Sequence, residues 1–437
     1  MKRMIDIRRG MLFKMIAAVA LSVVMITSGC SNSAEVEAEL KAMYHNIPAD
    51  ASMVVSGDLK KIVEQTGGKV EDGKIVATPK LDKIESAGIQ GMPEMDMKAI
   101  RDNMEVLSAG IEAGAFAAFI EKGKYYTIFT IRDLAALKAA IDKKDPRPWE
   151  KYNDIEFKGE YYIMNKGQHL WVSGPVDLKD LEQYAQLSEV GSFLGNGYAE
   201  KMSKSEDAFN MWMSLDGIYS GMSFSQQAQA RMAMSMLFEG PKYLVGGGNF
   251  RGKGLEFEAM PVTADYSPAK CVIEVSKIDP GVVSGLGGNA NRVVAMNVSQ
   301  KLVGQIKDFG KSMGGAVPAE IWNLISPIDG TVAGAMSDAD GVEGCYKLIV
   351  TTNGKEDASL AQFMGDYGKV KVQGTTLTLL NGNYGNGKLV VGDVAKKMKD
   401  AWFAAASVSE QKGESGVVYL MLVPAEGTLK IKLNLEF

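Results

Sequence analysis

The chain has 437 residues, of which 46% are hydrophobic and 23% charged, and its formal net charge is −5 at pH 7. This apolar fraction is typical of globular proteins and excludes a largely disordered chain. The acidic balance comes without a basic stripe, so we expect no nucleic-acid partner.

The first 30 residues have the pattern of an export signal. A basic start (Lys2, Arg3, Arg8 and Arg9) precedes an uncharged, mostly apolar run over residues 15–26. This run is shorter than the roughly 20 apolar residues that a membrane-spanning helix needs, and its proportions are those of a secretory signal. We therefore assign residues 1–29 to a signal peptide.

Cys30 follows Ile26-Thr27-Ser28-Gly29, and this segment resembles the lipobox of bacterial lipoproteins. The resemblance implies that Cys30 receives lipid, becomes the mature N-terminus and anchors the protein to a membrane. Thr27 departs from the pattern, because a bulkier aliphatic residue is usual there. Ser31 is compatible with sorting to the outer membrane, so we expect an outer membrane lipoprotein that faces the periplasm. The alternative is an ordinary cleaved signal with an incidental cysteine.

Residues 30–46 follow as a tether. Glu35, Glu37 and Glu39 make residues 31–41 polar, which predicts a flexible connection or a short exposed helix.

The mature chain contains one pattern twice, over residues 51–63 and 290–303. Each copy is an apolar run followed by Asp58 or Asn297 where a helix N-cap would lie, and then by apolar residues at helical spacing. Each copy therefore predicts a strand, a cap and a helix. We expect two halves, residues 47–265 and 266–437.

The elements that follow recur in the same order in both halves. In the first half we expect a helix at 93–107, a hairpin of 111–120 and 125–131, a helix at 134–141, strands at 155–157, 161–164 and 170–172, a helix capped by Asp177, and strands at 208–215 and 255–260 with a helix inserted at 220–240. In the second half we expect strands at 328–333 and 346–351, and then the segments 372–379 and 388–391, which together reproduce residues 157–172 of the first half. A helix capped by Asp393 that includes Trp402 follows, and then strands at 416–423 and 428–437 that match 208–215 and 255–260. This order predicts an α+β fold of two pseudo-repeats, in which antiparallel hairpins carry helices packed on one side.

A family resemblance rests on two segments. They are Tyr44-His45-Asn46-Ile47-Pro48-Ala49-Asp50-Ala51-Ser52-Met53-Val54-Val55, a short way after Cys30, and Asp329-Gly330-Thr331-Val332-Ala333. Together they resemble a family of uncharacterised lipoproteins from Bacteroides-like bacteria, filed as a domain of unknown function. The similarity covers nearly the whole mature chain. It implies an envelope lipoprotein and supplies no catalytic residues.

Residues suited to catalysis are sparse. The only histidines, His45 and His169, lie in different segments and lack a partner at metal-ligand spacing, so we interpret both as surface residues. The glycine runs 246–248 and 285–288 lack the strand-to-helix context of a nucleotide site, and we interpret them as turns. Glu112 and Asp329 occupy equivalent positions in the two halves and read as solvated turn residues. Sequence alone leaves open a glycan hydrolase whose carboxylates meet only in space.

Aromatic residues gather after a proline-rich loop, at Trp149, Tyr152, Tyr161, Tyr162 and Trp171. Exposed, they would form an aromatic platform that stacks on sugar rings, with Trp149, Tyr152 and Trp171 as its main members. The alternative, which we favour, is that they pack into the core of a hairpin.

Sulfur-bearing residues offer two further hypotheses. The chain has 26 methionines, and Met232, Met234 and Met236 could bind cuprous copper, although methionine as a flexible core residue is the better interpretation. Cys271 and Cys345 lie in strand-like runs and could form a disulfide in an oxidising envelope, or remain buried free thiols. We predict no cofactor and no metal.

These observations favour a lipid-anchored envelope protein that binds or scaffolds and has no catalytic role. Its partners would be the membrane, through the lipid on Cys30, and an unidentified envelope ligand or protein. The groove between the two halves would be the natural ligand site.

Overall fold

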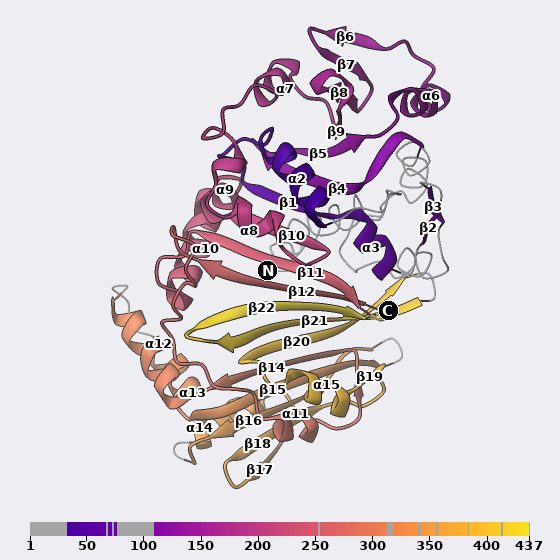
Figure 1. Ribbon diagram of the computed structural model, residues 1–437. Coiled ribbons are helices and arrows are strands. Elements are labelled where there is room, and N and C mark those ends of the chain that lie inside the picture. The colour runs from indigo at the N-terminus through magenta and orange to yellow at the C-terminus, as the bar shows by residue number, and fades with distance from the viewer. Residues whose placement is uncertain are drawn as a thin grey trace.

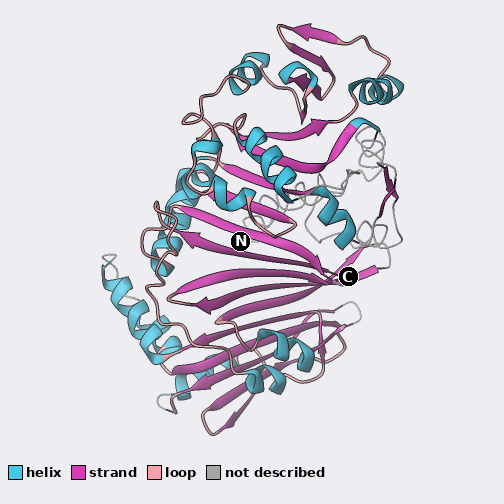
Figure 2. Cartoon of the chain, in the orientation of Figure 1, coloured by secondary structure: helices cyan, strands magenta, loops and turns pink. Residues whose placement is uncertain are grey.

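The computed structural model describes residues 33–66, 69–71, 74–76, 109–251, 254–312, 318–339, 342–354, 357–382, 384–411 and 414–436. Within them the chain has the predicted α+β fold, in which one 18-stranded sheet carries helices (Figures 1 and 2). The signal peptide, Cys30 and the helix predicted at 93–107 lie outside the described residues.

The first half contributes ten strands to the large sheet. They are β1 (Met53–Asp58), β4 (Ile111–Glu121), β5 (Lys124–Ile131), β6 (Glu150–Tyr152), β7 (Ile155–Lys158), β8 (Tyr161–Met164), β9 (His169–Ser173), β10 (Phe209–Ser214), β11 (Tyr243–Arg251) and β12 (Gly254–Val262). Its α-helices are α2 (Ser33–Tyr44), α3 (Leu59–Gln65), α6 (Leu134–Lys144), α7 (Leu178–Tyr184), α8 (Ala199–Ser203), α9 (Leu215–Ser220) and α10 (Phe224–Leu237). β2 (Lys69–Glu71) and β3 (Lys74–Val76) pair separately.

The second half contributes eight strands. They are β14 (Arg292–Val298), β15 (Ile328–Ala339), β16 (Val342–Thr352), β17 (Lys369–Gln373), β18 (Thr376–Asn381), β20 (Phe403–Gln411), β21 (Glu414–Ala425) and β22 (Thr428–Glu436). Its helices are α11 (Pro280–Gly285), α12 (Gln300–Ser312), α13 (Ala319–Ile325), α14 (Asp357–Gly365) and α15 (Val391–Met398). β13 (Asn289–Ala290) and β19 (Leu389–Val390) form a small separate pair.

The strand order is β6-β7-β8-β9-β5-β4-β1-β10-β11-β12-β22-β21-β20-β14-β15-β16-β18-β17, and every neighbouring pair is antiparallel. The central β12–β22 pair divides the sheet into two series of strands. Counted outward from β12, the series is β11, β10, β1, β4, β5, β9 and β8. Counted outward from β22, the strands at the equivalent positions are β21, β20, β14, β15, β16, β18 and β17. By this order β21 matches β11, and the predicted match to 208–215 is wrong. That the halves arose as a repeat stays a prediction.

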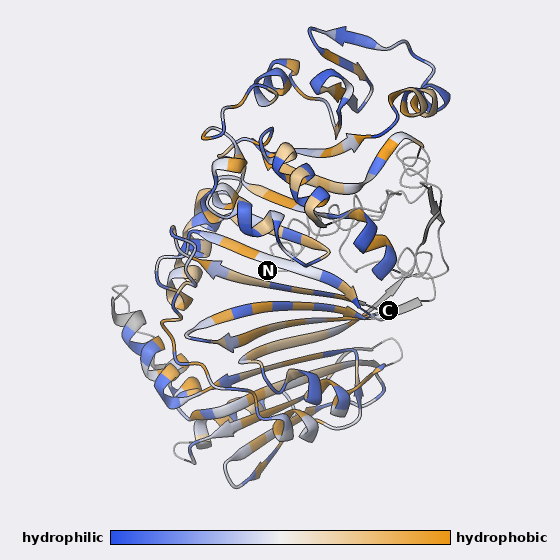
Figure 3. Ribbon diagram, viewed as in Figure 1, coloured by the Kyte–Doolittle hydropathy of each residue, from blue (hydrophilic) through white to orange (hydrophobic). Residues whose placement is uncertain are grey.

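Side chains alternate across the strands and build cores on both faces of the first half. Met53 and Val55 of β1 belong to one core with Leu59 of α3 and Leu137 of α6. Val54, between them in the strand, belongs to a second core to which α2, α7 and α8 contribute. Helices therefore cover both faces of the first half, which differs from the one-sided packing that we expected. Figure 3 shows the hydrophobic segments along these elements.

The second half is also packed on both faces. Val293 and Ala295 of β14 lie under α11 and α15 in a third core. On the other face α12 covers Val298, and α14 covers Val350 of β16 and Leu377 and Leu379 of β18. A strip of this face that includes Val294 and Leu420 is left exposed.

The segment predicted as a tether is largely a packed helix. Val36, Leu40, Met43 and Tyr44 of α2 are buried against the sheet, and the Tyr44 hydroxyl lies 2.5 Å from Ser56 Oγ. The expectation of an exposed connection over 31–41 is therefore wrong for the described part. The error arose because three glutamates masked apolar residues spaced three to four apart, which is the spacing of a helix face.

Two of the four predicted caps are confirmed. Asp58 and Asp177 accept hydrogen bonds from the first turns of α3 and α7. Asn297 does not cap α12, because Ser299 Oγ accepts from the Leu302 N–H at 3.2 Å instead. Asp393 lies inside α15, which ends at Met398 and excludes Trp402.

No helix in the described part of the chain is long and apolar enough to span a membrane.

Candidate binding surfaces

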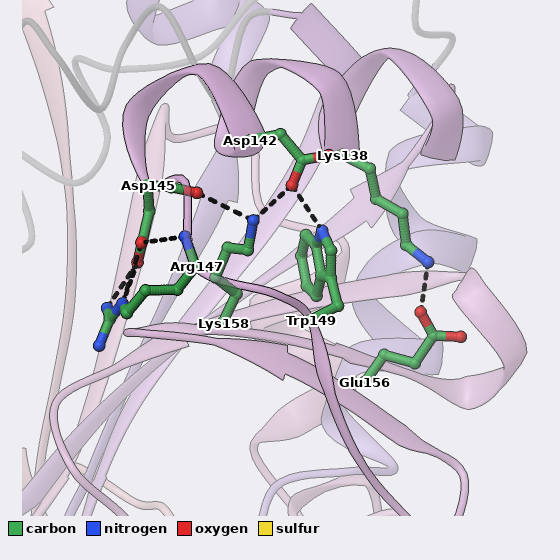
Figure 4. Close-up of polar contacts among 7 residues, drawn as sticks. All are labelled: Lys138, Asp142, Asp145, Arg147, Trp149, Glu156 and Lys158. Atoms are coloured by element: carbon green, nitrogen blue, oxygen red, sulfur yellow. Dashed lines mark hydrogen bonds and ion pairs between the residues drawn. The ribbon is translucent and has the colours of Figure 1, made fainter.

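A charged cluster surrounds Trp149 where α6 meets β7 (Figure 4). We use this name for Trp149 together with Lys138, Asp142, Asp145, Arg147, Glu156 and Lys158. Lys138 and Asp142 are four residues apart on α6 and so share one helix face. Glu156 and Lys158 are two residues apart on β7 and so share one strand face.

Lys158 is the buried centre of the charged cluster, with only 3% of its side chain exposed. Its Nζ donates to Asp142 Oδ1 at 2.5 Å and to the Asp145 carbonyl oxygen at 2.9 Å. The same Asp142 oxygen accepts from Trp149 Nε1 at 2.8 Å. One carboxylate therefore satisfies both a buried ammonium and an indole.

The Trp149 ring is already engaged by cations of the protein itself. Nζ of Lys138 and Nζ of Lys158 lie 5.3 and 5.4 Å from the ring centroid, within the range of cation–π attraction. Lys138 is in turn paired with Glu156. The ring therefore ties α6 to β7.

Two acidic members of the cluster, Asp142 and Asp145, are held ionised. The hydrogen bond from Lys158 lowers the pKa of Asp142, and the Trp149 indole lowers it further although desolvation opposes both. The Arg147 side chain lowers the pKa of Asp145 to about 2, with Nε donating at 2.9 Å. Neither carboxyl is suited to donate a proton near neutral pH, so the cluster reads as a structural tie.

The aromatic platform predicted around Trp149, Tyr152 and Trp171 is not formed. Trp149 packs against the first core, whereas Tyr152 and Trp171 belong to the second core on the opposite face. Trp171 is fully buried, and Tyr161 and Tyr162 are buried as well. The favoured alternative, core packing, is what the structure has, because strand alternation sends neighbouring aromatic residues to different faces.

His169 is buried, and its interpretation as a surface residue is wrong. Only 8% of it is exposed, its Nδ1 lies 2.7 Å from Asn165 Nδ2, and burial lowers its pKa to about 4. His45 lies just after α2 and its backbone N–H donates to the Lys41 carbonyl.

The remaining predicted site residues lie on several different elements. Cys271 and Cys345 are free thiols, so the disulfide alternative is wrong, and Cys271 forms an isolated bridge with Phe238 and not a strand. Asp329 Oδ1 accepts from the Gln300 N–H at 3.1 Å at the start of α12, while Glu112 lies in β4. Met232, Met234 and Met236 lie on α10, as expected for a helix. Among the described residues, no group of three or more His, Cys, Asp and Glu could hold a metal ion.

The glycine run 246–248 lies inside β11, so its interpretation as a turn is wrong. The run 285–288 does form a turn after α11, with positive φ at Gly287 and Gly288.

A row of apolar residues, two of them exposed and three partly exposed, crosses five strands of the second half. In register these residues are Leu348, Gly334, Val294, Ala405 and Leu420, which we call the apolar row. Val294 is 46% and Leu420 40% exposed, and Met336, two residues along β15 from Gly334, is 42% exposed. At an interstrand spacing of about 4.8 Å the row spans roughly 19 Å. A contiguous exposed apolar surface is a usual mark of a binding site.

Sequence reasoning missed the apolar row. Residues 293–296 read Val-Val-Ala-Met, which predicts a strand buried on both faces. Only the strand order and helix positions reveal that one face is left uncovered.

Comparisons with known proteins add little to this description. No family model matches the chain, and no curated protein matches it. Among solved structures, crystal form I of TP0453 aligns with a TM-score of 0.28 and 7% identity, over 81% of this chain and 95% of that one. Crystal form III gives a TM-score of 0.27 and 8% identity, over 81% of this chain and 96% of that one. Crystal form IV gives a TM-score of 0.26 and 10% identity, over 50% of this chain and 79% of that one. Similarity at this level supports no statement about function.

Proposed function

We propose that this chain is a lipid-anchored protein of the outer membrane, facing the periplasm, that binds the acyl chain of a lipid on the apolar row and has no catalytic role. The observation that carries the proposal is the exposure of Val294 and Leu420 on a sheet whose opposite face is buried. The pattern around Cys30 supports the anchor.

The chemistry of the apolar row favours an acyl chain over a polar ligand. Gly334 has no side chain, and the other four side chains are aliphatic and can neither donate nor accept a hydrogen bond. Gly334 and Ala405 flank Val294 and keep the surface low beside it. Arg292 is exposed two residues from Val294, on the same face of β14, where it could meet an anionic headgroup.

The first test is a thermal-shift assay on the mature chain from Ser31 against single-chain phospholipids, envelope glycans and metal ions including cuprous copper. A ligand that binds only the folded state raises its stability, so we expect saturable stabilisation by the phospholipids. The variant Leu420→Lys should lose this stabilisation. Leu380→Lys is the matched control, because Leu380 is 39% exposed and lies outside the row. Stabilisation by glycans or metals alone would overturn the lipid assignment.

The anchor is tested separately with Cys30→Ala in cells. We expect loss of acyl labelling and release of the protein from the membrane fraction. Unchanged labelling would show that Cys30 is not the lipid site, whatever the outcome of the binding assay. No observation favours the carboxylate-dependent hydrolase, so we propose no second function.

A further inference from the structure

The strand β17 forms one end of the large sheet, and its only strand partner among the described residues is β18. It reads Lys369-Val370-Lys371-Val372-Gln373, and all of these residues except Val370 are exposed. The other end of the sheet is β6, which has three residues. An edge of five residues presents a row of unpaired backbone groups to any extended segment that approaches it.

The two faces of β17 differ in chemistry. Lys369 and Lys371 pair in register with Leu380 and Thr378, whereas Val370 and Val372 pair with the buried Leu379 and Leu377. Within the described residues neither Lys369 nor Lys371 takes part in an ion pair. The edge therefore offers two unpaired cations on one side and apolar surface on the other.

The surroundings of β17 extend the apolar side and fix the strand. Phe363 and Tyr367 are 42% and 51% exposed and their rings lie 5.1 Å apart. The Tyr367 carbonyl accepts from Tyr346 Oη at 3.0 Å and from Asn381 Nδ2 at 2.8 Å, just before the strand begins. The edge is thus held in place before any partner arrives, which lowers the entropic cost of binding.

The hairpin register identifies the backbone groups that face outward. Gln373 pairs with Thr376 across the two-residue turn at Gly374, so Gln373, Lys371 and Lys369 form the hydrogen-bonded pairs with β18. The N–H and C=O groups of Val370 and Val372 therefore point to the open edge.

We propose that β17 accepts an extended partner segment in which acidic and apolar residues alternate, adding it to the sheet as a further strand. Acidic side chains of that segment would lie beside Lys369 and Lys371, and its apolar side chains would continue the valine side. A second copy of this chain fits less well. Antiparallel self-pairing centred on Lys371 would place this lysine opposite itself, and like charges directly opposite are destabilising.

The experiment uses the mature chain and a fluorescein-labelled peptide, Glu-Val-Glu-Val-Glu-Val-Glu, with a Lys-Val repeat of equal length as the comparison. Fluorescence anisotropy should show saturable binding of the acidic peptide, weakened by salt, and at least about tenfold weaker binding of the basic one. Val372→Pro removes an outward N–H at a position where an edge strand tolerates proline, and it should abolish binding. Val372→Ala, the matched control, should retain most of it.

The double variant Lys369→Glu with Lys371→Glu keeps the hairpin and should bind the basic peptide in preference to the acidic one. This variant tests the proposal even if Val372→Pro does not fold. Binding that ignores peptide charge, or that survives Val372→Pro in a folded protein, would overturn the proposal. Failure to bind either peptide would also overturn it, and would mean that the lysines only prevent pairing at the edge. Self-association through β17 in place of peptide binding would overturn it as well.

Discussion

His169 lies at the start of β9, and burial lowers its pKa from the usual 6.5 to about 4. The neutral ring accepts from Asn165 Nδ2 through Nδ1, and protonation there would oppose that donor. Since the unfolded state takes up a proton first as the pH falls, the free energy of unfolding should decrease between pH 6.5 and pH 4.

We therefore predict that His169 alone removes about 3 kcal/mol of stability across that pH window. Urea unfolding at a series of pH values measures this loss. His169→Asn, which keeps an acceptor for Asn165, should flatten the dependence between pH 6.5 and pH 4. An equal slope in wild type and variant would contradict the assigned burial.

Within the charged cluster, replacing Asp142 and replacing Lys158 should cost different amounts of stability. Asp142→Asn leaves the buried Lys158 ammonium without its counter-charge, whereas Lys158→Met leaves only a half-exposed carboxylate that water can solvate. We expect the aspartate variant to lose more stability than the lysine variant in equilibrium denaturation. The reverse order would mean that Lys158 is solvated.

At the scale of single residues, some positions were predicted correctly from the sequence and others were not. Asp58 and Asp177 were identified as caps because a short acceptor directly before an apolar helical pattern is a local signal. Core packing of Trp171 was favoured correctly, but His169 was placed wrongly at the surface, since its burial depends on strands that come together across the sheet.

At the scale of elements, β11 shows why a glycine run need not be a turn. A Cβ added to Gly248 would lie 2.4 Å from the Phe209 ring, which stacks on Phe257 at a centroid distance of 5.9 Å. The glycine therefore makes room for an aromatic pair on the neighbouring strands. Sequence alone gives no sign of that neighbour.

Gly248→Val should consequently destabilise the protein by about 1–3 kcal/mol, the usual cost of overpacking. Gly392→Ala is the control, because nothing lies within 4 Å of a Cβ there and the residue is inside α15. That control should be neutral or stabilise by up to about 1 kcal/mol. Thermal unfolding of both variants checks the pair, and a harmless Gly248→Val would show that β11 and β10 are not packed as described.

The first strand and the hairpin of β4 and β5 were predicted close to their observed bounds, because they are long, apolar and bounded by turn residues. β20 was missed. Its opening Phe-Ala-Ala-Ala-Ser is poor in β-branched residues, so the strand depends on pairing with β14 and β21.

At the scale of the molecule, β12 and β22 join the halves into one sheet. Leu433 and Leu435 of β22 are buried in the core of the first half, and Glu258 of β12 pairs with Lys430 and Lys432. Residues on both sides of the boundary predicted between residues 265 and 266 therefore contribute to the same hydrophobic core.

We predict that a fragment ending at residue 265 does not unfold cooperatively, because it exposes the β12 edge and lacks both leucines. Circular dichroism during heating measures this directly. A fragment with a sharp transition close to that of the whole mature chain would show that the first half is an independent domain.

The α+β class could be predicted from alternating strand and helix patterns, but the apolar row could not. Its five residues come from five strands between positions 294 and 420, and their exposure depends on which strip of the sheet the helices leave open. No local pattern in the sequence encodes that strip.

The most direct test of the proposed binding role is native mass spectrometry of the mature chain mixed with a single-chain phospholipid. We predict that the wild type and Leu380→Lys each retain one lipid per chain and that Leu420→Lys retains none. Absence of bound lipid in the wild type, or equal retention by Leu420→Lys, would contradict binding on the apolar row.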